Sequence, residues 1–152
     1  MEGFLPVVAP ASAVPRPTHD FYASDEELLF AVAAALNEEY RAVVDAGLHV
    51  QIDDAHFAIA YDTMLGDLAA YRTWAELRTE ALIRALDGIP PDRARYHVCW
   101  GSWNAPHVGD VPLRDAIMHR VALRARRVAC SSTGRPAGLV PPVDVGDDGP
   151  WH

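Results

Sequence analysis

Of the 152 residues of this chain, 50% are hydrophobic and 22% are charged, which is the composition of a globular domain with a core of its own. The formal net charge of -8 argues against nucleic acid or an anionic membrane surface as the main partner. No apolar stretch is long enough to cross a bilayer, and no signal peptide pattern opens the chain, so we expect a cytoplasmic protein. In that reducing compartment its two cysteines, Cys99 and Cys130, should be free thiols.

An apolar run near the start of the chain, Leu5–Ala9, predicts a buried strand, and the proline-rich segment 10–17 that follows it predicts a loop. A long helix should begin after Ser24, whose side chain can cap it while Glu27 stands at the third helical position. Apolar residues then recur at helical spacing until Gly47, which predicts the end of the helix.

The same alternation continues through the rest of the chain. Strands are predicted over 48–52 and 95–99, helices over 63–87 and 112–123, and the start of a fourth strand over 128–130. Long helices between short apolar strands form parallel crossovers, so the pattern predicts an α/β fold with a parallel sheet. In such sheets the ligand site lies at the carboxyl ends of the strands.

Candidate site residues stand at two of these strand ends. His97 and Cys99 are two positions apart, so their side chains should point to the same side of the strand. An imidazole and a thiol are ligands that zinc prefers, although in isolation this pair is also compatible with a buried thiol and a hydrogen-bonded core histidine. The preceding strand ends at Asp53 and Asp54, one of which should order a loop. Asp53, in phase with Gln51, is the one we assign to the site.

Seven segments add a pattern in their order and spacing, namely Pro6–Pro10, Ala35–Arg41, Asp45–Gly47, Gln51–Asp54, Tyr96–Asn104, Pro106–His107 and Asp110–Asp115. Together they resemble the catalytic barrel of cobalamin-independent methionine synthase. The similarity is greatest to the shorter branch of that family, which also resembles epoxyalkane:coenzyme M transferase. The resemblance extends roughly from Gly3 to Met118.

The fold that this resemblance implies is part of a TIM (β/α)8 barrel. A whole barrel needs about 250 residues and eight strands, whereas this chain offers three to four βα units. We therefore expect a partial barrel over 1–130 and a disordered or aberrant tail over 131–152, where no helical or strand period continues. A partial barrel leaves sheet edges and core surface uncovered, which predicts an oligomer or a partner that supplies the missing barrel half.

The function that the resemblance implies is zinc-dependent methyl transfer from a methylated folate to homocysteine, giving methionine. Zinc would hold the sulfur of the substrate as a thiolate near neutral pH and so make it a nucleophile. One alternative is alkyl transfer to another small thiol, such as coenzyme M. Another is a non-catalytic remnant of such an enzyme, and we expect this chain alone to be inactive.

Carried over residue by residue, the resemblance makes His97 and Cys99 zinc ligands. The glutamate that the family uses as its next ligand is absent here, and Cys130 stands near that place as a candidate third ligand. No residue is assigned a catalytic role of its own.

The resemblance also implies contacts with the substrate. Asp53 would hold the amino group of homocysteine. Trp100 could form a wall of the pocket, with rim packing as the alternative. His107 could orient substrate or ligands, with a simple turn before Pro112 as the alternative.

Overall fold

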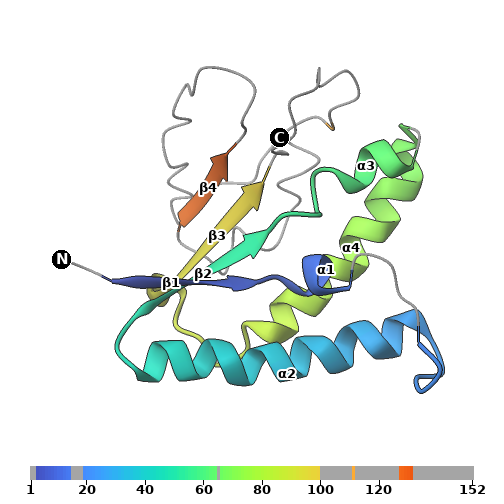
Figure 1. Cartoon of the computed structure of the whole chain (residues 1–152). Helices are drawn as coiled ribbons and strands as arrows, with labels where there is room; N and C mark the ends of the chain where they lie inside the picture. Colours follow the sequence, from blue (N-terminus) through green and yellow to red (C-terminus); the bar gives the residue numbers. More distant parts are fainter. Residues whose placement is uncertain (1–2, 15–18, 65, 100–110, 112–126, 132–152) are drawn as a thin grey trace.

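The computed structural model describes residues 3–14, 19–64, 66–99, 111 and 127–131. Within these residues the elements alternate between strand and helix (Figure 1). The strands are β1 (Phe4–Val8), β2 (His49–Asp54), β3 (Ala94–Cys99) and β4 (Arg127–Ser131). The helices are α1 (Pro10–Ala13), α2 (Asp25–Asp45), α3 (Ala60–Thr63), α4 (Leu68–Ala85) and the short 3-10 helix η1 (Pro91–Arg93).

The four strands form one parallel sheet in the order β1-β2-β3-β4. This confirms the predicted α/β class and the parallel pairing. Since all strands run the same way, the carboxyl ends of β1, β2 and β3 lie at one edge of the sheet. Val8, Asp53 and His97 stand side by side there, because Val8 pairs with Asp53 and Asp53 pairs with His97.

The long helix α2 begins as the sequence predicts. The Ser24 hydroxyl accepts a hydrogen bond from the backbone N–H of Glu27 at 3.1 Å, and the Glu27 carboxylate accepts one from the N–H of Ala23 at 2.7 Å. These bonds satisfy donors that have no partner within the helix. The chain leaves the helix through Gly47, whose φ of +83° favours a residue without a side chain.

The predicted start of the second long helix is wrong. The helix predicted from Thr63 begins instead at Leu68, because Gly66 adopts a φ of +77° and separates α3 from α4. The carboxylate of Asp67 then caps α4 by accepting from the N–H groups of Ala69 and Ala70, both at 3.0 Å.

The proline-rich segment after β1 is not entirely a loop, because it contains the one-turn helix α1. Pro10 stands at the first position of that helix, where its fixed φ fits and its missing N–H costs nothing.

The predicted fourth strand is confirmed as β4, which extends to Ser131, the first residue of the tail that the sequence predicts. The helix predicted over 112–123 lies outside the described residues, as does the rest of the predicted tail, 132–152.

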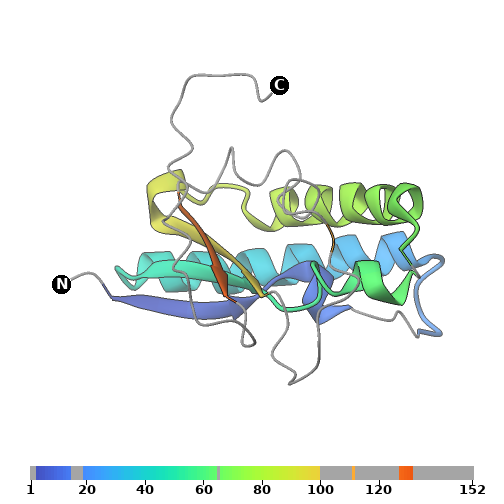
Figure 2. The same ribbon diagram turned by 90° about the horizontal axis from the view of Figure 1, so that it is seen from above.

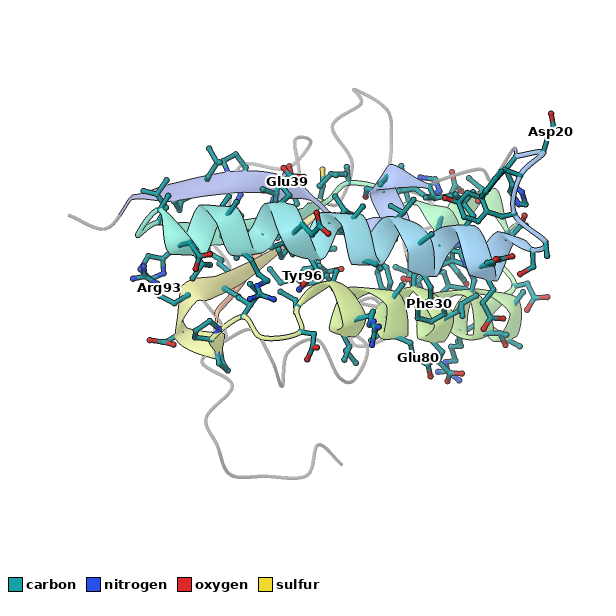
Figure 3. The ribbon with its side chains drawn as sticks, turned by 90° about the horizontal axis from the view of Figure 1, so that it is seen from below. Asp20, Phe30, Glu39, Glu80, Arg93 and Tyr96 are labelled. Carbon is teal, nitrogen blue, oxygen red and sulfur yellow. The ribbon has the colours of Figure 1, made fainter. Side chains whose placement is uncertain are left out.

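The two long helices lie side by side and cover one face of the sheet (Figure 2). We call this side of the sheet the helix face. Seen from the helices, Tyr96 of β3 lies between α2 and α4 (Figure 3). The core on this face is built from large side chains that are almost completely buried, chiefly Leu29, Tyr40, Ile52, Tyr71, Leu82 and Val98. Each stabilises the fold by about 1.5–3 kcal/mol through apolar burial.

Among the helices of the described part, none combines the length and the apolar character that a membrane-spanning segment needs.

Candidate functional site

The side chains of β2 and β3 divide strictly between the two faces of the sheet. Along β3, Tyr96 and Val98 are buried against the helices, and His97 and Cys99 alternate with them as half-buried residues. Along β2 the same alternation sets the buried residues against half-buried Gln51 and Asp53. We call the side that carries Gln51, Asp53, Arg95, His97 and Cys99 the site face. The alternation agrees with the prediction that His97 and Cys99 point to the same side.

His97 and Asp53 meet on the site face. Their backbones are partners in the β2–β3 register, and Nδ1 of the imidazole contacts Oδ1 of the carboxylate. The His97 side chain is 16% exposed, whereas that of Asp53 is 44% exposed. A carboxylate can only accept, so the natural arrangement is a proton on Nδ1 donated to Asp53. In that tautomer Nε2 carries no proton, which is the form in which an imidazole nitrogen acts as a ligand or base.

Cys99 is the last residue of β3 and a free thiol. It follows His97 on the same face, at the carboxyl end of the sheet. An imidazole nitrogen and a thiolate sulfur placed in this way fit zinc in their chemistry. Across the described ranges, however, no group of three or more His, Cys, Asp or Glu side chains is arranged to hold a metal ion. The described residues thus offer a pair of zinc ligands.

Of the other predicted site residues, the structure describes only the backbone position of Cys130. Trp100 and His107 lie outside the described residues. The backbone of Cys130 pairs with that of Val98, while Ser131 is the partner of Cys99. Val98 belongs to the helix face, so the register sets Cys130 apart from His97 and Cys99, which lie together on the site face.

Asp54, next to Asp53, lies on the helix face and is fully buried. One oxygen accepts from the Ser12 hydroxyl at 2.6 Å and from the N–H of Phe57 at 3.3 Å, and the other accepts from the Tyr96 hydroxyl at 2.8 Å. Burial raises the pKa of the Asp54 carboxyl, and these hydrogen bonds oppose that rise. Asp54 thus joins α1, β3 and the turn after β2. It is the loop-ordering aspartate of the two, as the assignment of Asp53 to the site implies.

The network around Asp54 continues through Ser12 and Tyr40. The Ser12 oxygen also accepts from the N–H of His56 at 2.9 Å. Tyr40 of α2 donates its hydroxyl proton to the carbonyl of Val8, the last residue of β1, and burial raises the pKa of this tyrosine. These part-buried bonds fix the strand ends from the helix face. Sequence reasoning missed them, since each bond joins residues more than 30 positions apart.

A second polar group lies one step toward the amino ends of the strands on the site face. Arg95 donates to the side-chain oxygen of Gln51, and its guanidinium stands 4.0 Å from the ring centroid of Phe4. Stacking on a ring is a common way to hold an arginine in place. The sequence offered one signal for this group: Arg95 is a charged residue in a strand that is otherwise apolar.

Comparison with known proteins gives one informative similarity. Over 93 residues the chain is 33% identical to the 2-hydroxypropyl-CoM lyase of Xanthobacter autotrophicus (strain ATCC BAA-1158 / Py2), a match that covers 60% of this chain. The same match covers 21% of the lyase, so the chain corresponds to about a fifth of that protein. No family model matches the chain. No solved structure matches it either. The similarity agrees with the coenzyme M side of the resemblance noted above and gives no support to methionine synthase.

Proposed function

We propose that this chain carries the thiol-binding part of a site that forms or breaks a carbon–sulfur bond of a small thiol, with coenzyme M as the first candidate. The observation that carries the proposal is the placement of His97 and Cys99 on one face at the carboxyl end of β3, with Asp53 against the imidazole. The similarity to 2-hydroxypropyl-CoM lyase supports the choice of thiol and favours it over homocysteine.

We further propose that the sheet is one part of a (β/α)8 barrel. Four parallel strands with long helices on one face are what three to four successive βα units produce. In a barrel the site face would be the inner one, and the ends of β2 and β3 would open at the mouth where barrel enzymes bind their substrates.

His97 and Cys99 are the residues that would hold zinc in this proposal, and further ligands would have to come from outside the described residues, because Cys130 is in register with Val98 of the helix face. When bound, zinc lowers the pKa of a coordinated thiol, so that the substrate sulfur is present as a thiolate near neutral pH. Asp53 would keep the imidazole of His97 in place.

The reaction of such a thiolate with an epoxide balances simply. The sulfur attacks one ring carbon, a C–S bond forms and the C–O bond of the ring breaks. The electron pair goes to the oxygen, which takes a proton from water, and the product is a 2-hydroxyalkyl thioether. Cleavage of the same thioether is the reverse. Because the matched part is about a fifth of the lyase, binding of the thiol is the step to test in this chain.

The test is calorimetric titration of the zinc-loaded chain with coenzyme M and, separately, with homocysteine. We expect coenzyme M to bind, and His97→Ala and Cys99→Ala to abolish both zinc retention and thiol binding. His49→Ala is the matched control, since this histidine stands at the amino end of β2. Binding of homocysteine alone would restore the methionine synthase hypothesis. Retention of neither zinc nor either thiol would identify a non-catalytic remnant.

A further inference from the structure

We infer that Asp53 is a positioning residue for His97: its carboxylate holds the proton of the imidazole on Nδ1 and thereby presents Nε2 to a metal at the carboxyl end of β3. The inference rests on the proposed function in one respect, namely that His97 is a metal ligand. It differs from the sequence-based expectation, in which Asp53 contacts the substrate.

The backbone brings the two groups together. Asp53 and His97 are partners in the register of neighbouring parallel strands, whose backbones lie about 4.8 Å apart. Both side chains are on the site face, and the atoms in contact are Oδ1 and Nδ1. Since an ionised carboxylate has no proton to give, the contact is a hydrogen bond only when Nδ1 carries one.

The adjacent aspartate cannot take over this task. The carboxylate of Asp54 is on the opposite face, where Ser12, Tyr96 and Phe57 donate to it. Asp53 is 44% exposed, and a pair with one such exposed partner contributes little to stability. The contact should therefore affect the tautomer and orientation of the His97 ring more than the free energy of unfolding.

Fixing the ring in one tautomer has a chemical consequence. A neutral imidazole binds metal through a nitrogen that has no proton, and a carboxylate on the other nitrogen selects that form, orients the ring and makes it a stronger ligand. Loss of such an outer partner typically weakens metal binding about 10- to 100-fold. Cys99, next along the same face, stands where a second ligand to the same ion is needed.

The experiment compares the wild-type chain, Asp53→Ala and the control Asp45→Ala, which removes an exposed carboxylate at the end of α2. Long-range ¹H–¹⁵N correlation spectra of the metal-free proteins, recorded at a pH of about 8, report the tautomer of each histidine ring. The His97 signals are those missing from His97→Ala. We expect a proton on Nδ1 in wild type and control, and a shift toward the Nε2–H form in Asp53→Ala. The same tautomer in all three proteins would overturn the inference.

Zinc affinity, measured by competition with a chromophoric chelator, separates the two proposals. We expect Asp53→Ala to bind zinc about 10- to 100-fold more weakly than wild type and Asp45→Ala to bind it equally. Equal affinity in wild type and Asp53→Ala overturns the positioning role and leaves the proposed function standing. A wild-type chain that binds no zinc overturns the proposed function, and the metal-positioning role with it.

Discussion

The helix face and the site face of this sheet use neighbouring aspartates in opposite ways. Asp54 is fully buried and receives three hydrogen bonds that join α1, β3 and the turn after β2. Asp53, one residue earlier, is 44% exposed and contacts the imidazole of His97. A single step along a strand turns a side chain to the other face. The comparison shows that the same residue type serves folding on one side and the candidate site on the other.

The largest effect should come from Asp54→Ala. This change leaves the buried donors of Ser12, Tyr96 and Phe57 without their acceptor, so we expect a loss of about 3 kcal/mol in the free energy of unfolding. Asp53→Ala should change it by less than about 0.5 kcal/mol. Urea denaturation of both variants measures the difference. Equal losses of unfolding free energy in the two variants would contradict a structural role for Asp54 that Asp53 does not share.

A second pair of neighbours, Val98 and Cys99, tests the same division with apolar burial. Val98 is completely buried on the helix face, so Val98→Ala should cost about 2 kcal/mol of stability through the cavity it leaves. Cys99→Ala should cost less than about 1 kcal/mol while removing the thiol of the site. Thermal unfolding measures both, and a larger cost for Cys99→Ala would contradict the assignment of faces.

The smallest effect concerns pH. Burial raises the pKa of Asp54 in the folded chain above its unfolded value, so the folded state holds the proton more tightly. The stability linked to this proton is fully present below the unfolded pKa, which is about 3.9. It is lost as the pH rises through the folded pKa. Comparing the pH dependence of unfolding in wild type and Asp54→Asn isolates this contribution. In Asp54→Asn, stability should not show this decline as the pH rises. An identical decline in both proteins would mean that other groups cause it.

Local patterns predicted the parts of the molecule that depend on a single strand or helix. Alternation along β3 was enough to put His97 and Cys99 on one face, and Ser24 with Glu27 was enough to place the start of α2. The late start of α4 was also readable, since Asp67 after a glycine is a good capping signal.

Contacts between distant segments were beyond the sequence. The meeting of Asp53 with His97 depends on the register between β2 and β3, which no single strand encodes. The bond from Ser12 to Asp54 depends on the turn taken by α1, in a segment where prolines predicted only a loop. The choice between coenzyme M and homocysteine likewise came from comparison with a known protein, because the zinc-binding pair alone fits either thiol.

The central claim is that His97 and Cys99 coordinate one metal ion on the site face. It is tested most directly by titrating the metal-free chain with Co²⁺, which replaces zinc in such sites and absorbs in the near ultraviolet when a thiolate binds it. The account predicts a thiolate band in wild type that is absent from Cys99→Ala and weakened in His97→Ala. A wild-type chain without the band, or a band that survives in Cys99→Ala at full strength, would contradict it.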